Sequence, residues 1–235
     1  HSPKRNRTFS RSRNMTKQLT KAASIAYSTR ETIQNSFDIG KMVAELSVPG
    51  AVVECGLGAG ANFAAMILGY ESDGQKGTYF GFDSFEGIQL AGPKDSEQPG
   101  IGAISHDVNV SPDQLLVSSG ITVHSMENVW TNLAMCGIKS DNITLVKGWV
   151  QNTIPGWVKA IGQISVLRLD MDIYEPTLFA LRLLFPMVQP GGIVIIDDWA
   201  LSGARLACEE YFSEIDYQPK YRLVENSTPV WFVKK

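Results

Sequence analysis

Residues 50–60 read GAVVECGLGAG, an apolar run followed by glycines at positions 56, 58 and 60, and residues 61–70 continue as an apolar segment. The first six residues suit a buried β-strand, and the later segment suits a helix. Glycines at alternate positions let the backbone pass close to a ligand, and the first N–H groups of the next helix point to the same place. This order of elements indicates an α/β protein with a ligand site at the carboxyl end of its first strand.

Apolar runs typical of strands alternate with helical patterns through the rest of the chain. This alternation predicts a Rossmann-like, mostly parallel sheet with helices on both faces. The last two apolar runs are separated by only three residues, which predicts a C-terminal antiparallel hairpin. The expected strands are 78–83, 143–146, 164–169, 193–196, 221–225 and 229–233, and the expected helices are 124–136, 176–188 and 202–212.

The composition of the 235 residues is that of an ordinary globular protein, with 44% hydrophobic and 19% charged residues. It excludes a disordered, collagen-like or disulfide-dense chain. No uncharged stretch reaches the ~20 apolar residues that a membrane span needs. The three cysteines are scattered without CxxC spacing, which argues against a disulfide framework and against structural zinc. We therefore expect a cytoplasmic protein.

The net charge of −3 is unevenly distributed. Residues 1–21 hold seven cations and no acid, so the remainder carries 14 cations against 24 acids. Such a start occurs in nucleic-acid arms and transit peptides, but a solvated arm is the simpler interpretation. We expect residues 1–47 to form a basic arm and helical extension, and residues 48–235 to form one domain. The acidic domain gives no support for a nucleic-acid partner; we expect a small-molecule partner, with a homo-oligomer left open.

Residues 84–120 form a glycine-containing stretch without a clear strand or helix pattern. The stretch is too long for an ordinary connection between a strand and a helix, and loops of this length are usually functional lids or disordered segments. We expect a lid that becomes ordered when ligands bind.

Two acids stand beside the expected ligand site. Glu54 directly precedes the glycine turn, and Asp83 closes the second expected strand. The turn departs from the GxGxxG dinucleotide fingerprint and resembles motif I of S-adenosylmethionine-dependent methyltransferases. In that setting Glu54 would meet the cationic amino group of the cofactor, and Asp83 would accept hydrogen bonds from its ribose hydroxyls.

Four more acids follow two other expected strands, Asp170 and Asp172 after the fourth and Asp197 and Asp198 after the fifth. Carboxylates at adjacent strand ends repel one another unless a cation neutralises them. A hard divalent cation such as Mg²⁺ prefers such oxygen ligands, and the absence of cysteine and histidine in both segments argues against zinc. One of the four acids could instead cap a helix.

Together these motifs resemble the macrocin O-methyltransferase (TylF/MycF) family from about residue 48 to the C-terminus. The segments that carry the resemblance are Glu54-Cys55-Gly56, Asp83-Ser84-Phe85-Glu86-Gly87, Lys147-Gly148-Trp149 with Thr153-Ile154-Pro155, residues 170–177 (DMDIYEPT), and residues 190–199 with Gly203-Ala204-Arg205.

The resemblance implies a class I methyltransferase sheet, an S-adenosylmethionine-dependent methyltransferase domain over residues 48–235, and Mg²⁺ as second cofactor. It implies that Asp197 and Asp198 bind the metal with Asp172 or Asp170, of which we slightly favour Asp172. Family members methylate sugar hydroxyls on antibiotics and related natural products. The basic amino terminus and residues 84–120 depart from the family pattern, so the acceptor is not specified. The implied cofactor-binding residues are Glu54, Gly56, Gly58, Gly60, Asp83, Ser84, Gly148, Trp149 and Asp170.

The expected activity is Mg²⁺-dependent transfer of a methyl group to a hydroxyl of a small natural product, such as a sugar or glycoside. Asp172 or the loop residue His106 would take the hydroxyl proton. A catechol-type O-methyltransferase is the alternative enzyme. A non-catalytic cofactor-binding module is the alternative of another class, and the cluster of carboxylates argues against it.

Overall fold

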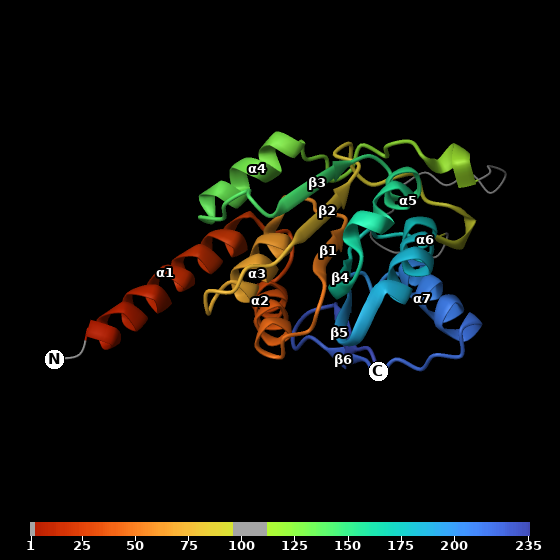
Figure 1. Cartoon of the computed structure of the whole chain (residues 1–235). Helices are drawn as coiled ribbons and strands as arrows, with labels where there is room; N and C mark the ends of the chain where they lie inside the picture. Colours follow the sequence, from red (N-terminus) through yellow and green to blue (C-terminus); the bar gives the residue numbers. More distant parts are fainter. Residues whose placement is uncertain (1–2, 96–111) are drawn as a thin grey trace.

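The computed structural model describes the backbone of residues 3–95 and 112–235, and the side chains of residues 14–95 and 114–235. The described part forms a seven-stranded sheet in the order β3-β2-β1-β4-β5-β7-β6 (Figure 1). The first five strands are parallel, and β7 runs antiparallel to β5 and β6. The predicted sheet and hairpin are confirmed. The strands are β1 Ala51–Cys55, β2 Tyr79–Asp83, β3 Ile143–Lys147, β4 Ile164–Leu169, β5 Val188–Ile196, β6 Arg222–Leu223 and β7 Val230–Val233.

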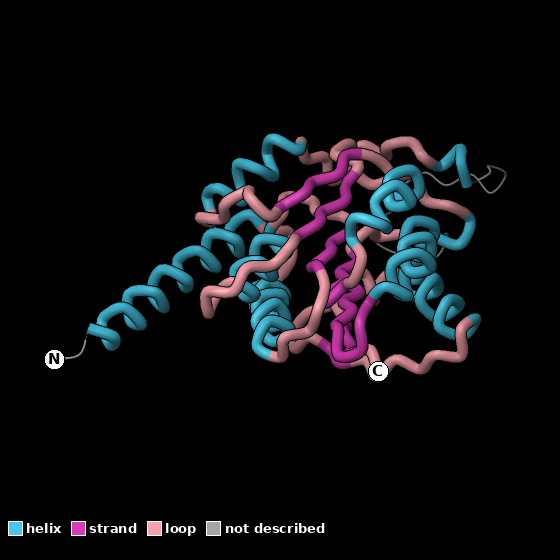
Figure 2. Tube along the Cα trace, in the orientation of Figure 1, coloured by secondary structure: helices cyan, strands magenta, loops and turns pink. Residues whose placement is uncertain are grey.

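Helices cover both faces of this sheet (Figure 2). Side chains of α1 to α4 contribute to an apolar cluster on one face, and side chains of α5 to α7 contribute to a cluster on the other. Neighbouring strand residues alternate between the clusters, as Val52 and Val53 of β1 do. The helices are α1 Pro3–Ile25, α2 Arg30–Glu45, α3 Ala61–Tyr70, α4 Met126–Met135, α5 Val150–Ile161, α6 Tyr174–Leu184 and α7 Ser202–Glu214, with short 3₁₀ turns η1 Pro93–Asp95, η2 Pro112–Leu115 and η3 Phe185–Met187.

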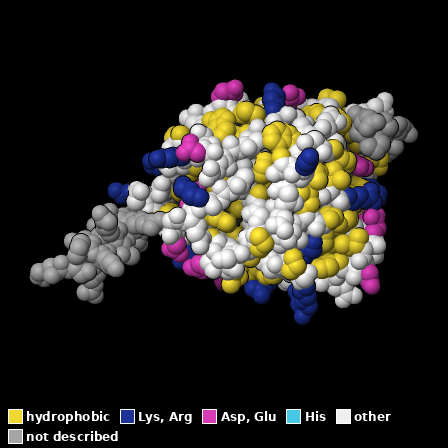
Figure 3. Space-filling view, in the orientation of Figure 1, with side chains coloured by type: hydrophobic (Ala, Val, Ile, Leu, Met, Phe, Trp, Pro, Cys, Tyr) yellow, Lys and Arg dark blue, Asp and Glu magenta, His cyan; other side chains and the backbone are white. Residues whose placement is uncertain are grey.

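The segment before the glycine motif is helical, and α1 extends away from the sheet (Figure 1). Ala22 near its end is buried, and Lys21 Nζ donates a hydrogen bond to the carbonyl oxygen of Met135 at the end of α4. On the face drawn in Figure 3, the described Lys and Arg side chains are scattered and form no continuous basic patch. Among the described residues, no helix is long and apolar enough to cross a membrane.

The boundary between α6 and β5 differs from the prediction. The expected helix was 176–188, whereas α6 begins at Tyr174 and ends at Leu184, and β5 already begins at Val188. The β4–β5 ladder shifts register here, from Ile164 opposite Val188 to Val166 opposite Ile193. This irregularity accommodates the Pro-Gly-Gly sequence within the strand, because a bulge tolerates residues that a regular ladder does not.

Helices α2 and α3 pack with almost no space between their backbones. A Cβ atom added at Gly40 would lie 2.1 Å from the carbonyl oxygen of Met66, and one added at Gly69 would lie 1.9 Å from that of Phe37. Each helix therefore needs a glycine at this crossing. The packing holds α3, which starts at the glycine turn, against the rest of the fold.

The Gly40→Ala substitution should lower the free energy of unfolding by about 1–3 kcal/mol, because the added methyl group has no room beside the α3 backbone. Urea-induced unfolding followed by circular dichroism measures this change. Gly156→Ala is the matched control, since Gly156 lies in α5 with open space around its Cβ position and should gain up to about 1 kcal/mol of helix propensity. Equal stability of the two variants would contradict the close-packing argument.

Candidate functional site

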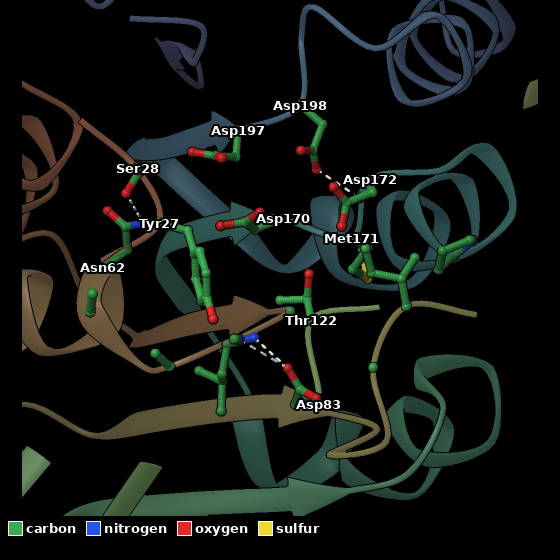
Figure 4. A pocket seen from close by; sticks show the side chains of 18 of the residues that line it. Tyr27, Ser28, Asn62, Asp83, Thr122, Asp170, Met171, Asp172, Asp197 and Asp198 are labelled. Atoms are coloured by element: carbon green, nitrogen blue, oxygen red, sulfur yellow. Dashed lines mark hydrogen bonds between the residues drawn. The ribbon is translucent and has the colours of Figure 1, made fainter. Parts of the chain in front are cut away.

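A cavity of about 540 Å³ opens at the carboxyl ends of the central strands. Its wall includes the glycine loop after β1, the end of β2 and the residues that follow β4 and β5. Two further segments complete it, the linker between α1 and α2 (26–29), whose Tyr27 and Ser28 are labelled in Figure 4, and the turn between β6 and β7 (226–228). The cavity lies where an open α/β sheet ordinarily binds its ligand.

The glycine loop has the conformation that the sequence motif predicts. Gly56, Gly58 and Gly60 all have positive φ, and a Cβ atom at Gly56 would lie only 1.7 Å from the carbonyl oxygen of Asp170. Gly56 and Gly58 line the cavity, whereas Gly60 caps the start of α3. A side chain at position 56 would therefore displace the end of β4, independently of any ligand.

Asp83 lies at the end of β2, as predicted, and lines the cavity. Its Oδ2 accepts hydrogen bonds from the backbone nitrogens of Leu57 and Gly58 at 2.7 and 3.2 Å, and its Oδ1 accepts one from Phe85 at 2.7 Å. Burial raises the pKa of Asp83, and these backbone donors oppose that shift. Asp83 thus fixes the shape of the glycine loop.

Three other predicted cofactor residues surround this carboxylate. Ser84 lines the cavity and donates a hydrogen bond to the carbonyl oxygen of Gly87 at 2.7 Å. Trp149 also lines the cavity. Gly148 does not appear in the wall, but its backbone nitrogen donates to the carbonyl oxygen of Asp83 at 2.9 Å. Gly148 therefore contributes through the backbone that carries Trp149.

Glu54 has different surroundings from those that the motif predicts. Its side chain is only 1% exposed and does not line the cavity. Its Oε1 accepts a hydrogen bond from Arg168 Nε at 3.0 Å, and its Oε2 has no hydrogen-bond partner among the described residues. Burial raises the pKa of Glu54 to about 8 against the opposing effect of Arg168. In this structure Glu54 forms an internal ion pair with Arg168, and its contact with a cofactor stays a prediction.

Arg168 on β4 is a functional residue that the sequence reasoning missed. It is 1% exposed, and its Nη2 donates hydrogen bonds to Asp170 Oδ2 at 3.0 Å and to Asp197 Oδ1. Burial alone would lower the pKa of Arg168, but the surrounding carboxylates raise it above its usual range. The available signal was a charged residue within an apolar strand that was expected to be buried.

The acids that follow β4 and β5 converge at the cavity. One carboxylate oxygen each of Asp170, Asp197 and Asp198 lies within 4.8 Å of the others (Figure 4). Asp172 is outside this group, has a φ of 66°, and donates its backbone N–H to Asp198 Oδ2 at 2.8 Å. The geometry thus favours Asp170 as the third metal ligand, whereas the sequence analysis slightly favoured Asp172.

The environment of these acids disfavours their charged forms. Burial, followed by nearby carboxylates, raises the pKa values of Asp170 and Asp198 well above the usual range of an aspartate. The same effects raise the pKa of Asp172 to about 6. A cation that reaches the cavity would reverse this preference.

Several cavity residues have no signal in the sequence. Tyr27 is 80% exposed and reaches into the cavity between Asp170 and Asp83 (Figure 4). Asn62 Nδ2 donates to Ser28 Oγ at 3.3 Å, which connects the α1–α2 linker to the first turn of α3. These contacts join segments that are distant in the chain, so residue spacing does not reveal them.

The described parts of the expected lid are held against the domain. Gln89 and Ser118 form an antiparallel bridge, and the carboxylate of Asp95 accepts a hydrogen bond from the backbone nitrogen of Tyr174 at 2.9 Å. Lys94 Nζ pairs with Glu210 at 2.8 Å. His106 and the middle of the expected lid lie outside the described residues, so their roles stay predictions.

Comparison with known proteins identifies relatives of this chain. A family model described as macrocin O-methyltransferase (TylF) matches residues 3–233. The 8-demethyl-8-(2,3-dimethoxy-alpha-L-rhamnosyl)-tetracenomycin-C 4'-O-methyltransferase of Streptomyces olivaceus is 35% identical over 70% of this chain, and the mycinamicin III 3''-O-methyltransferase of Micromonospora griseorubida is 31% identical over 70%. The matched regions span 58% and 61% of these two relatives.

Solved structures share the architecture. The O-methyltransferase NovP has a TM-score of 0.70 at 26% identity, with 88% of this chain and 81% of NovP covered. The calicheamicin methyltransferase CalS11, at 19% identity, has a TM-score of 0.67 with 99% and 93% covered, which shows similarity of fold alone. The chain has the class I methyltransferase fold and, because the family match extends over nearly all of its length, it belongs to the macrocin O-methyltransferase (TylF) family.

Proposed function

We propose that this protein transfers a methyl group from S-adenosylmethionine to a hydroxyl of a small natural product, with a sugar or glycoside as acceptor. The single observation that carries the proposal is the glycine loop, which Asp83 holds open beside the carboxylates at the ends of β4 and β5. The tetracenomycin and mycinamicin relatives support it, since both are named as O-methyltransferases of natural products. The cavity volume suits a small ligand.

The residues around the cavity fit the cofactor. Gly56 and Gly58 leave their backbone open to it, Asp83 and Ser84 lie where the ribose would bind, and Trp149 offers an aromatic surface. Each oxygen of a carboxylate has two lone-pair sites, so Asp83 can accept a ribose hydroxyl in addition to backbone donors. We do not assign the amino group of the cofactor to Glu54, because Glu54 does not line the cavity.

The carboxylate cluster fits a hard divalent cation. We propose that Asp170, Asp197 and Asp198 hold Mg²⁺, since their oxygens converge and are the ligand type that Mg²⁺ prefers. Arg168 bonds one oxygen of Asp170 and one of Asp197, which leaves the second oxygen of each available. A bound Mg²⁺ would lower the pKa of an acceptor hydroxyl.

We propose Asp172 as the proton acceptor. It lines the cavity beside the carboxylate cluster without belonging to it. Its backbone N–H donates a hydrogen bond to Asp198 Oδ2, which fixes the Asp172 backbone relative to the Asp198 side chain. As a carboxylate that lines the cavity, Asp172 can take the proton of an acceptor hydroxyl.

The cofactor assignment predicts that Asp83→Ala weakens binding of S-adenosylhomocysteine about ten- to a hundredfold, the effect of losing charge-assisted hydrogen bonds. Isothermal titration calorimetry measures the affinity, and circular dichroism confirms that the variant is folded. Asp141→Ala is the control, because Asp141 is exposed and precedes β3 at the opposite edge of the sheet. If the folded unsubstituted protein does not bind S-adenosylhomocysteine, the methyltransferase proposal is wrong.

The metal assignment predicts that EDTA abolishes methyl transfer to a panel of glycosides and that added Mg²⁺ restores it. Asp170→Asn, Asp197→Asn and Asp198→Asn should each weaken Mg²⁺ binding by at least about tenfold, because supporting residues of metal sites already contribute that much. Asp172→Asn should retain Mg²⁺ binding in calorimetry and lose turnover. Undiminished methyl transfer in EDTA would instead show that the carboxylates are structural.

A further inference from the structure

The sheet places a row of charged side chains directly beyond the apolar cluster that faces α1 to α4. In this cluster Val52 of β1, Val166 of β4 and Ile195 of β5 lie on the same face. Side chains two residues further along a strand point to the same face. Glu54 therefore follows Val52 on this face, Arg168 follows Val166, and Asp197 follows Ile195. Glu54 and Arg168 are register partners in the β1–β4 ladder.

The guanidinium of Arg168 contacts three carboxylates. Its Nε lies 3.0 Å from Glu54, its Nη2 lies 3.0 Å from Asp170, and the same Nη2 donates to Asp197. Arg168 is the bulkiest of the fully buried side chains. A buried guanidinium is stable only with such partners, and its planar shape and multiple donors suit a site that must satisfy several acids at once.

We propose that Arg168 is a positioning residue that acts as a permanent counter-cation of the carboxylate cluster, and that Glu54 affects the site only through Arg168. The inference rests on the proposed function only in taking Asp170, Asp197 and Asp198 as the cation site. Glu54 fixes the Nε side of the guanidinium, so Nη2 is directed toward Asp170 and Asp197. The cluster is thereby partly neutralised by the chain itself.

This arrangement has a consequence for cation affinity. Arg168 and a divalent cation are both attracted by Asp170 and Asp197, and the two positive charges repel each other across a short distance. The protein should bind a divalent cation more weakly than the same carboxylates would without Arg168. The cluster should also be stable without any metal, because each of its acids has a partner in the chain. Arg168 bonds Asp170 and Asp197, and the backbone N–H of Asp172 bonds Asp198.

The test replaces the Glu54–Arg168 pair as a unit, because removing only Arg168 would leave Glu54 buried without a partner. The Glu54→Leu/Arg168→Met double variant replaces both charged side chains with shorter, apolar ones. A second double variant, Glu54→Gln/Arg168→Gln, is also neutral but retains hydrogen bonding, and serves if the first does not fold. Arg168→Lys is the matched control that keeps the positive charge.

The measurements are Mn²⁺ affinity by calorimetry and thermal unfolding in EDTA and in Mn²⁺. We expect the neutral double variants to bind Mn²⁺ about tenfold more tightly than the unsubstituted protein. The positive charge lost at Arg168 contacts Asp170 and Asp197 directly, whereas the negative charge lost at Glu54 lies on the Nε side of the guanidinium. Their melting temperature should rise on adding Mn²⁺ by more than that of the unsubstituted protein. Arg168→Lys should stay within about threefold of the unsubstituted affinity, because it retains the charge.

Two outcomes would overturn the inference. Unchanged or weaker Mn²⁺ binding in a folded neutral double variant would show that Arg168 only fills the core. A Glu54→Gln variant that loses S-adenosylhomocysteine affinity as strongly as Asp83→Ala would show that Glu54 contacts the cofactor directly, because glutamine still offers an oxygen to Arg168 Nε. Failure of the proposed function is separate, since it appears as no S-adenosylhomocysteine binding in the unsubstituted protein.

Discussion

The ion pairs of Arg168 are the interaction on which the site depends. Three strands that end at the same edge each bring a carboxylate, and a buried charge is tolerated only when it is compensated. Arg168 compensates Glu54 below the cavity and contacts Asp170 and Asp197 at its floor. A fold that places these acids together without a metal therefore requires a cation within the sheet itself.

Backbone hydrogen bonds join the glycine loop and the acid cluster to the same sheet. The ladder continues past the strand ends, with Asp170 N donating to the carbonyl oxygen of Cys55 and Asp197 N donating to that of Leu169, both at 2.9 Å. Gly56 N donates to the carbonyl oxygen of Phe82 at 2.8 Å. Residues anchored in this way sit on the sheet rather than on independent loops, which is the placement that holds functional groups most accurately.

The strand periodicity was sufficient to place Asp83, Asp170 and Asp197 at one edge, because the carboxyl ends of parallel strands lie together. The periodicity could not show which of the acids pair with Arg168. The link between Glu54 and Arg168 depends on the β1–β4 register, which neither strand specifies by itself. The start of β5 was missed for a related reason, since Pro and Gly predict a turn unless a neighbouring ladder shifts register to accept them.

One wall of the cavity joins two segments that are far apart in the sequence. Hydroxyl groups of Thr29 and Thr32 at the start of α2 form hydrogen bonds with Ser227 in the β6–β7 turn, and Thr32 and Ser227 are 195 positions apart. Contacts of such sequence separation are slow to form, because closing a long loop has a large entropic cost. During synthesis the glycine loop and the acids can assemble first, while this wall must wait until the β6–β7 hairpin has emerged. A chain that has lost its C-terminal hairpin would thus keep most of the binding groups but leave the cavity open on the side of α2.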